Sequence, residues 1–465
     1  MDRRTLLAAT AASAAAGILP TRGMAAESTR AVGEAVRIAK IERSQGTGKM
    51  FVPLGEFRPL DPRYVEEEWF ASGIDDFGQP YKTLIYLRRP RDAARFSGVV
   101  IVEPLHASAN TPVHSYCGPY IARSGHGWAC VASQKTPLDS RLKASNPDRY
   151  ASLHIEAGGP PPGAMQLGAM SPAEWQARIE ALGRYNRASS SILAQTGAAL
   201  RGPGGPFGRV RHTILVGHSQ TGGVVTNYVR EAHEARRRAD GGSIYDGYYP
   251  TGAAGVRFGP RDVPLIQLLS DADIDDPVRS NGRAYRREDS DAPHDRYRLY
   301  ELAGAAHMGT RNPPHNETAP WVERTGGAIK AGDRMTSYPH NEMFNMGLSH
   351  LVRWITEGKA PPRGERIATG PDGMFLKDEF GNTRGGVRCA QMDVPHVTYH
   401  PDPPGSQSVV GTETPFDAAR MRSLYQTPAN YARRFNARLD TLIAQGWFLK
   451  GDAPDMRAEA AAQQF

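Results

Sequence analysis

The sequence predicts an α/β fold in which a mostly parallel sheet of about eight strands is flanked by helices and carries long loop insertions and a C-terminal extension. Three observations predict this class. Short runs of β-branched and other apolar residues recur between longer helical stretches, as buried parallel strands do. One run leads through a glycine-flanked serine directly into a helical stretch. The 49 glycines and 36 prolines of the 465-residue chain indicate many structured loops around such a core.

The first half of the chain supplies the strands that precede this serine. Residues 64–73 and 81–87 are rich in aromatic and β-branched side chains and flank an Asp-Asp-Phe-Gly turn, which predicts an antiparallel pair. Residues 97–102 and 127–132 are short apolar runs, which predicts buried strands of the central sheet. The stretch 175–200 has the length and composition of a long helix.

The central motif is a strand, a tight turn and a helix with Ser219 at the turn. Residues 213–216 form a short apolar strand that runs into Gly-His-Ser-Gln-Thr-Gly at 217–222. This order predicts a nucleophile elbow, in which a strained serine needs small neighbours. The motif departs from Gly-x-Ser-x-Gly at Thr221, and the second glycine, Gly222, comes one residue later.

An elbow of this kind needs backbone donors for negative charge that develops on a carbonyl oxygen. The helix that begins behind Ser219 leaves amides without helical partners, so the Gln220 N–H is the first candidate. The loop after the strand 97–102 supplies the second donor in this architecture. We therefore expect a second backbone N–H near Leu105 or His106, with Leu105 as the named candidate.

Three further strands are expected after the elbow helix. Residues 244–252 begin the first of them and its loop. The other two end in acidic and basic candidates. The run 263–269 predicts a buried strand and is followed by Asp271 and Asp273, either of which could be the carboxylate that orients a histidine. Asp273 fits better by its distance from the strand end, and Asp271 stays open as the alternative. The alternating run 297–302 predicts a strand that leads into a loop of small residues carrying His307. Ser219, Asp273 and His307 therefore occur in the chain order of a serine triad.

The C-terminal part is predicted to wrap the core. Apolar residues recur at helical spacing over 342–357, which predicts an amphipathic helix. Residues 361–411 are rich in proline and glycine and are expected to be extended, and 417–444 are expected to be helical again. No low-complexity linker isolates this tail, so it is not expected to be a separate domain.

Composition bounds the classes of function. A hydrophobic content of 40% and a charged content of 23% are those of a folded protein. The formal net charge is +7, but the basic residues are scattered apart from one cluster at 236–238, so nucleic acid is not expected as a partner. Neither Cys-x-x-Cys nor His-Glu-x-x-His occurs, so neither a metal nor a cofactor is expected. Cys130 is expected to be a core residue, with a disulfide to Cys117 left open.

The N-terminus has the features of an export signal. Arg3 and Arg4 precede a leucine pair and an alanine-rich segment, and small residues at 23–25 offer a cleavage site. Residues 1–25 are therefore predicted to be a twin-arginine-like signal peptide, and 26–465 a single elaborated domain exported to the periplasm or the exterior of a bacterium. The apolar segment is too short for stable membrane insertion. Asp2 departs from the preferred residue at its position.

Several stretches together resemble the secreted alpha/beta hydrolase domain-containing proteins of bacteria. They are Gly-His-Ser-Gln-Thr-Gly at 217–222, Tyr-Val-Glu-Glu-Glu-Trp-Phe at 64–70, Glu-Leu-Ala-Gly-Ala-Ala-His at 301–307, Gly-Gly-Val-Arg at 385–388, and the stretches 351–362 and 446–449. This resemblance covers nearly all of the chain after residue 25. It implies an alpha/beta-hydrolase fold and a serine hydrolase mechanism carried by Ser219, Asp273 and His307, without naming a substrate or deciding between Asp271 and Asp273.

The triad implies acyl chemistry on a small-molecule substrate. His307, oriented by Asp273, would take the proton of Ser219 as its oxygen attacks a carbonyl. A carboxylic ester is the expected substrate, because an alkoxide leaving group demands less of the general acid than an amine does. The alternatives are a lactonase, amidase or acyltransferase on the same triad, or a non-catalytic binding protein on a hydrolase scaffold.

Overall fold

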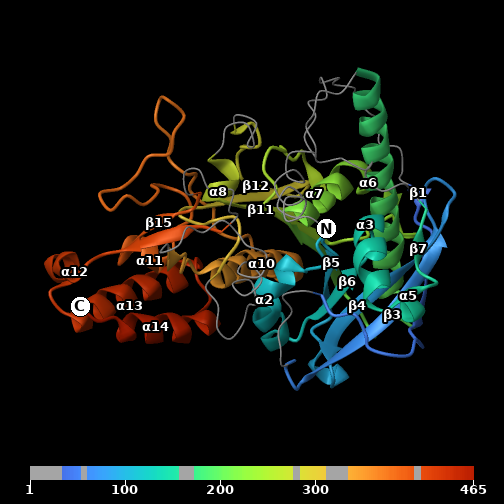
Figure 1. Cartoon of the computed structure of the whole chain (residues 1–465), viewed down its shortest axis with the longest axis horizontal. Coiled ribbons are helices and arrows are strands. Elements are labelled where there is room, and N and C mark those ends of the chain that lie inside the picture. Colours follow the sequence, from blue (N-terminus) through green and yellow to red (C-terminus); the bar gives the residue numbers. More distant parts are fainter. Residues whose placement is uncertain (1–33, 54–59, 157–171, 276–282, 311–333, 403–409) are drawn as a thin grey trace. The chain divides into compact units, whose positions relative to one another are not determined.

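The computed structural model describes residues 34–53, 60–156, 172–275, 283–310, 334–402 and 410–465 (Figure 1). The chain divides into two compact units. The first comprises Met1–Ala253 and Pro260–Pro264, and the second comprises Ala254–Gly259 and Leu265–Phe465. The predicted signal peptide, residues 1–25, lies outside the described residues.

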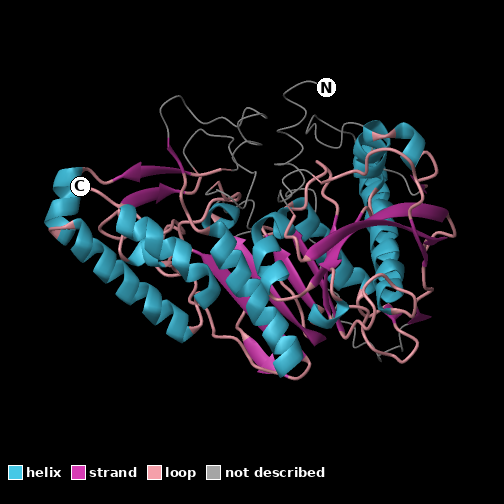
Figure 2. Ribbon diagram, turned by 90° about the horizontal axis from the view of Figure 1, so that it is seen from below, coloured by secondary structure: helices cyan, strands magenta, loops and turns pink. Residues whose placement is uncertain are grey.

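The first unit holds a parallel core of four strands with an antiparallel edge. The strand order is β10 (Gly247–Thr251), β8 (His212–His218), β5 (Val99–Pro104), β6 (Gly127–Val131), β4 (Pro80–Pro90), β3 (Tyr64–Ile74) and β2 (Lys40–Arg43), and β7 (His154–Ile155) also pairs with β4. Strands β10, β8, β5 and β6 are parallel, whereas β4, β3 and β2 alternate in direction. All residues of β5 are buried, as the apolar run predicts. The long, twisted antiparallel strands are seen at the right of Figure 2.

Helices of the first unit follow its strands. They are α2 (Pro112–Arg123), α3 (Lys135–Pro137), α4 (Lys143–Ser145), α5 (Pro147–Tyr150), α6 (Pro172–Arg201), α7 (Gln220–Asn227), the 3-10 turn η1 (Ala93–Arg95) and the π-helical turns η2 (Leu138–Leu142) and η3 (Tyr228–Ala232). The long helix predicted at 175–200 is α6, drawn in green in Figure 1. The buried carboxylate of Glu103, at the end of β5, accepts from the N–H groups of Val113 and His114 and so caps α2. The two-residue strands β1 (Glu34–Ala35) and β9 (Arg236–Arg237) pair separately.

The second unit carries the strands that end in the acidic and histidine candidates. Strand β11 (Arg261–Ser270) crosses the division between the units, and in the second unit the order is β11, β13 (Asp295–Leu302) and β12 (Ser290–Ala292). Helix α8 (Asp271–Ile274) follows β11 directly, and α10 (His340–Glu357) is the predicted amphipathic helix. The hydroxyl of Tyr300 on β13 lies 3.0 Å from Nδ1 of His350 on α10, so this helix packs against that strand.

The α/β class is confirmed, but the strands are more numerous than expected. Among the described residues, the main sheet has 11 strands. The three that the sequence did not reveal are β2, β7 and β12, which have four, two and three residues. Strands this short cannot carry an alternation signal, because alternation needs several consecutive residues to be recognised.

The C-terminal extension has a hydrophobic cluster of its own within the second unit. Its elements are β14 (Arg334–Met335), α11 (Ala390–Asp393), β15 (Val397–His400), β16 (Thr412–Pro415), α12 (Ala418–Tyr425), α13 (Pro428–Gln445), η5 (Lys450–Asp452) and α14 (Ala453–Ala462). Strands β14 and β15 both pair with β16. Helices α13 and α14 lie side by side (Figure 1) and bury Tyr431, Phe435 and Met456 among other apolar side chains. The predicted helix at 417–444 is broken at Gln426, whose φ is 64°, and Thr427 caps the new helix.

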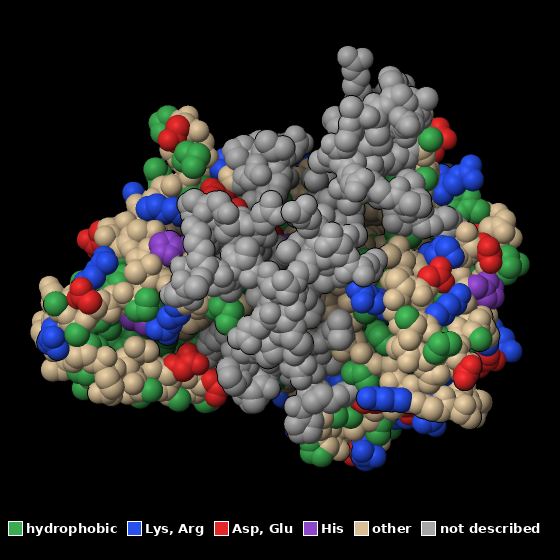
Figure 3. Space-filling model, viewed as in Figure 1, with side chains coloured by type: hydrophobic (Ala, Val, Ile, Leu, Met, Phe, Trp, Pro, Cys, Tyr) green, Lys and Arg blue, Asp and Glu red, His purple; other side chains and the backbone are tan. Residues whose placement is uncertain are grey.

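The remaining expectations concern cysteines, charge and membranes. Cys117, Cys130 and Cys389 are buried thiols, and burial raises the pKa of Cys389 to about 12. On the face drawn in Figure 3, basic and acidic side chains of the described residues are interspersed. Within the described ranges, no helix is both long enough and apolar enough to cross a bilayer.

Candidate active site

Ser219 sits at a strained elbow between β8 and α7, as predicted. Its φ of 58° and ψ of −121° are unusual for a residue with a side chain, and its N–H donates to the Thr251 carbonyl on β10 at 3.0 Å. A Cβ at Gly217 would lie 2.3 Å from the Thr221 carbonyl oxygen. A Cβ at Gly222 would lie 2.4 Å from the Thr251 carbonyl oxygen. The second glycine that the elbow needs is therefore Gly222.

Thr221, the departure from the usual motif, closes the turn with its hydroxyl. The His218 N–H donates to Thr221 Oγ1 at 3.0 Å, and the same hydroxyl donates to the His218 carbonyl at 2.9 Å. The side chain is fully buried. The threonine hydroxyl therefore links the last residue of β8 to the first turn of α7 by two hydrogen bonds, which a glycine could not form.

Replacing Thr221 with valine, which has nearly the same shape, removes both hydrogen bonds. We expect the free energy of unfolding to fall by about 1–3 kcal/mol, because the buried polar groups of His218 lose a partner. Urea unfolding followed by circular dichroism measures this. Thr221→Ser keeps the hydroxyl and should lose clearly less. Equal midpoints for Thr221→Val and the wild type would contradict this role of the hydroxyl.

The backbone N–H groups expected to stabilise an oxyanion differ in the partners that they already have. Gln220 is the first residue of α7, so its N–H belongs to the turn whose amides have no partner within the helix. The expectation that Leu105 supplies the second donor is wrong, because its N–H already donates to the Val131 carbonyl at 2.8 Å. His106 N–H likewise donates to the Asn110 carbonyl at 3.1 Å. The Ala107 N–H instead lies 3.2 Å from Oε1 of the Gln220 side chain.

The structure brings His307 and Asp273 together. Nδ1 of His307 lies 2.5 Å from Oδ1 of Asp273. The other carboxylate oxygen of Asp273 accepts from the Ser270 N–H at 2.7 Å, and the Asp273 N–H donates to Ser270 Oγ at 3.2 Å. This is a capping box at the start of α8. Asp273 is thus held on both sides, which orients its remaining oxygen toward His307.

Asp271, the alternative acid, has a different position. Its Oδ2 accepts from the Gly304 N–H at 3.0 Å, three residues before His307. Burial raises the pKa of Asp271 to about 6, with Lys377 and Thr383 acting in the opposite direction. The carboxylate that contacts the histidine ring is that of Asp273, and Asp271 holds the backbone of the histidine loop instead.

Two further contacts hold that loop. The Ala272 N–H donates to the Ala305 carbonyl at 3.2 Å, which links the loop to α8. Nε2 of His340 lies 2.9 Å from the Ala306 carbonyl, and burial lowers the pKa of His340, so the neutral ring donates there. His340 was not among the predicted site residues, and its only signal in the sequence is its position just before the predicted helix 342–357.

The candidate residues are therefore distributed over both units. Ser219, Gln220 and Leu105 belong to the first unit, whereas Asp273 and His307 belong to the second. Within the first unit, Ser219 lies between the end of β8 and the start of α7, and within the second unit Asp273 lies in α8, which follows β11 at once. This is the arrangement in which buried strands present functional residues at their carboxyl ends.

One group of side chains in the first unit has the composition of a metal site. Ligand atoms of His233, Glu234 and Asp262 lie within 4.8 Å of one another. The guanidinium of Arg237, however, contacts both carboxylates, with Nη1 2.7 Å from Asp262 and Nη2 2.5 Å from Glu234. A resident cation already balances these charges, so we assign the group to an ion-pair network.

Comparisons with solved structures show low identity and low TM-scores. Dienelactone hydrolase from Anabaena variabilis matches with 14% identity, 56% of this chain, 96% of that chain and a TM-score of 0.29. Brefeldin A esterase, a bacterial homologue of human hormone-sensitive lipase, matches with 12% identity, 64% of this chain, 77% of that chain and a TM-score of 0.30. No curated protein matches the sequence.

The comparison with family models is more extensive. Residues 44–458 match the model described as Alpha/beta hydrolase domain. The match spans both units and includes Ser219, Asp273 and His307. It confirms the predicted alpha/beta-hydrolase fold. Because it covers most of the sequence, the chain belongs to the alpha/beta hydrolase domain family.

Proposed function

We propose that this protein is a serine hydrolase that cleaves carboxylic esters of small molecules through Ser219, His307 and Asp273. The observation that carries the proposal is the backbone of Ser219, which holds a serine at φ 58° in a strand–turn–helix elbow. A strained conformation of this kind persists where the surrounding structure imposes it, and such sites cluster where a side chain must be presented. The 2.5 Å contact of His307 with Asp273 supports the assignment of the base.

In the proposed reaction, His307 accepts the proton of Ser219 as Oγ attacks the ester carbonyl carbon. Asp273 accepts a hydrogen bond from Nδ1 and so fixes the tautomer in which Nε2 is the proton acceptor. His307 then returns the proton to the departing alkoxide, which leaves an acyl-enzyme. A water molecule, deprotonated by His307, attacks the acyl-enzyme; the bond to Ser219 Oγ then breaks, His307 returns the proton to this oxygen, and the carboxylic acid is released.

The proposed oxyanion donors are the N–H groups of Gln220 and Ala107. The Gln220 N–H follows from the elbow itself. Ala107 replaces Leu105 as the second donor, because the Ala107 N–H is held by a side-chain carbonyl oxygen and not by a strand partner. That oxygen, Gln220 Oε1, is a neutral acceptor that the oxyanion of a bound substrate would displace. The side-chain Nε2 of Gln220 donates to Gln134 Oε1 at 2.9 Å, which helps to hold this side chain beside Ala107.

The test of the proposal has two parts. A fluorophosphonate probe should label the wild-type protein, and mass spectrometry should place the adduct on the peptide that contains Ser219. A panel of p-nitrophenyl esters, lactones and anilides should show turnover of esters above the others. Absence of labelling would instead indicate a binding protein on a hydrolase scaffold. Turnover confined to lactones or anilides would assign the triad to lactonase or amidase chemistry, and acyl transfer to an added alcohol would indicate an acyltransferase.

We also propose that the protein is exported by a bacterial twin-arginine pathway. The proposal is supported by Arg3 and Arg4, the alanine-rich segment and the small residues before position 26. Changing both arginines to lysine should abolish export, as measured by fractionation of a bacterium that expresses the full chain. Undiminished export of the double variant would contradict the proposal.

A further inference from the structure

The Gly-Gly-Val-Arg segment at 385–388 supplies no group to the proposed reaction, but it lies beside the loop that carries His307. The Val387 N–H donates to the Glu301 carbonyl at 2.7 Å, and the Ala303 N–H donates to the Val387 carbonyl at 3.2 Å. These two bonds form a parallel bridge with the last residue of β13. The bridge continues the pairing of β13 up to the first residue of the histidine loop.

The two glycines allow the segment to approach β13 this closely. Both have a left-handed backbone, with φ of 70° at Gly385 and 69° at Gly386, which a side chain would strain. A Cβ at Gly386 would lie 2.7 Å from the Glu301 carbonyl oxygen and 3.2 Å from Cβ of Ala303. Glycine at this position is therefore what lets Val387 pair with the start of the loop.

Arg388 supports the next residue of the loop through α11. Its Nη2 donates to the Met392 carbonyl at 2.7 Å, and its Nε donates to Asp393 at 2.7 Å. The buried side chain of Met392 packs on Gly304, where φ is 78° and a Cβ would lie 2.6 Å from the Met392 sulfur. Arg388 thus fixes the short helix that covers the loop three residues before His307.

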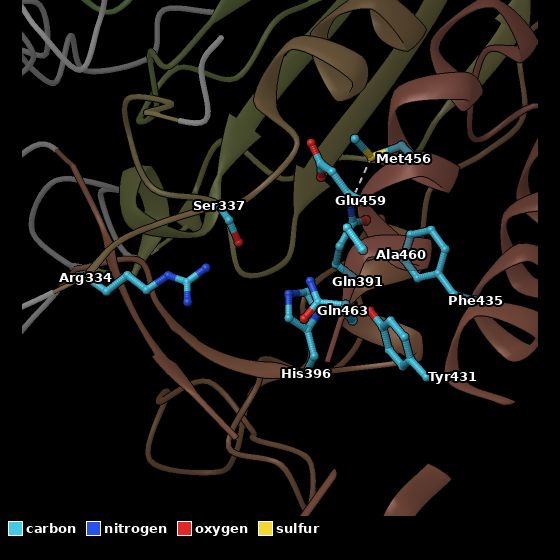
Figure 4. Close-up of a pocket in the computed structure, with 11 residues that line it drawn as sticks. Arg334, Ser337, Gln391, His396, Tyr431, Phe435, Met456, Glu459, Ala460 and Gln463 are labelled. Carbon is cyan, nitrogen blue, oxygen red and sulfur yellow. Dashed lines mark hydrogen bonds between the residues drawn. The ribbon is translucent and has the colours of Figure 1, made fainter. Parts of the chain in front are cut away.

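Helix α11 is in turn fixed from its other side. Nε2 of Gln391 donates to the sulfur of Met456 on α14 at 2.9 Å, drawn as a dashed line in Figure 4. Ala390 belongs to the hydrophobic cluster of the C-terminal helices. All three side chains are buried. The surface on which Gly304 packs is therefore part of a core and has little freedom to move.

The histidine loop is short, and each of its residues has a backbone hydrogen bond. The first of residues 303–306 bonds to Val387, and the other three bond to α8 and α10. Helix α8 also carries Asp273, whose Oδ1 lies 2.5 Å from Nδ1 of His307. A shift of the start of the loop relative to α8 would therefore change the contact between the imidazole and the carboxylate.

We propose that the Gly-Gly-Val-Arg segment positions His307, with Gly386 and Val387 as positioning residues. By fixing the start of the loop against β13, the segment sets the contact between Nδ1 of His307 and Asp273. The expected effect on turnover rests on the proposed serine hydrolase reaction. The effect on the contact itself does not, because that contact is present whatever reaction the protein catalyses.

The first test is Gly386→Ala, whose new Cβ must displace either the segment or the start of the loop. We expect kcat and kcat/KM for p-nitrophenyl acetate to fall together by about 100-fold, the loss that a misplacement of about 1 Å causes. Gly373→Ala is the matched control. Gly373 has φ 78° in the same stretch of chain, and a Cβ there would meet no atom nearer than 3.9 Å. This variant bears a similar backbone strain and should keep the wild-type kcat.

A proton spectrum separates positioning from a general loss of stability. In ¹⁵N-histidine-labelled protein, the Nδ1 proton of His307 in its short bond to Asp273 should resonate far downfield, and its loss in His307→Gln assigns it. In folded Gly386→Ala this signal should move upfield or disappear, whereas Gly373→Ala should keep it. A residue that only stabilised the fold would lower the urea midpoint and leave the signal of the folded molecules unchanged.

The outcomes separate the two proposals. An unchanged downfield signal or a wild-type kcat in Gly386→Ala would overturn the positioning role. If the wild type turns over no ester, the proposed function fails, and the downfield signal still tests the positioning role. Should Gly386→Ala not fold, Arg388→Lys takes its place, because a lysine cannot bond to the Met392 carbonyl and to Asp393 in the same way. It should move the same signal upfield, and an unchanged signal would again overturn the proposal.

Discussion

Replacing Ser219 with alanine is expected to reduce the turnover of p-nitrophenyl acetate by about a millionfold. The magnitude is that of removing the nucleophile from a serine triad, in which the remaining members cannot act alone. The change deletes a single oxygen and leaves the backbone at φ 58° with a side chain of similar size. Steady-state kinetics with the purified variant measures the effect, with the uncatalysed rate as the lower limit.

The interpretation depends on a folded variant. Far-ultraviolet circular dichroism and the unfolding midpoint of Ser219→Ala should match the wild type, because the Ser219 hydroxyl caps no helix. Ser145→Ala, at an exposed serine of α4 in the same unit, is the matched control and should keep full activity. Turnover of Ser219→Ala within tenfold of the wild type would sink the assignment of the nucleophile.

The sequence could predict the elements whose signal is local. The run at 213–216 is apolar and β-branched and is followed by small residues, so both the strand and the elbow are visible in ten or so consecutive letters. The same holds for β13 and the loop that carries His307, where alternation ends in a run of small residues. These elements lie within one or two residues of their predicted bounds because neighbouring residues alone determine them.

Features that depend on contacts across the chain were not predictable in this way. The Leu105 N–H was a reasonable donor until its partner was known, and that partner is Val131 on a strand 26 positions further along the chain, a pairing that periodicity cannot reveal. Thr221 looked like a departure from the motif, because its role depends on a hydrogen bond back to His218 that only the folded turn creates. In both cases the missing information was the hydrogen-bond partner of a backbone group.

The choice between Asp271 and Asp273 shows how close alternatives separate in three dimensions. Both residues lie in the four-residue helix α8. Asp271 accepts from the backbone of the histidine loop, whereas Asp273, two positions further on, contacts the imidazole of His307. Both carboxylates are buried, so burial does not distinguish them. They differ in their hydrogen-bond donor, which is the Gly304 N–H for Asp271 and Nδ1 of His307 for Asp273. Replacing each carboxylate in turn therefore tests which one orients the histidine.

Asp273→Asn is expected to lower turnover by about 10⁴-fold, because an amide that donates to Nδ1 stabilises the wrong tautomer of His307. Asp271→Asn should stay within about tenfold of the wild type, since an amide oxygen can still accept from the Gly304 N–H. Both variants are measured with the same ester over pH 6 to 9. Equal losses in the two variants would contradict the assignment of Asp273 as the orienting acid.

Asp271→Asn should also change how stability depends on pH. The pKa of Asp271 is raised to about 6 in the folded state, so its ionised form is disfavoured there relative to the unfolded chain. Where the carboxyl is protonated in both states, it does not change the free energy of unfolding. As the pH rises from about 4 to about 6, the carboxyl ionises more readily in the unfolded chain, and this lowers the free energy of unfolding by an amount on the order of 3 kcal/mol. The asparagine variant lacks this penalty, so its urea midpoint relative to the wild type should rise across that window. A constant difference between the two midpoints would mean that Asp271 does not titrate there, and the loop that carries His307 would then be held by a carboxylate ionised throughout.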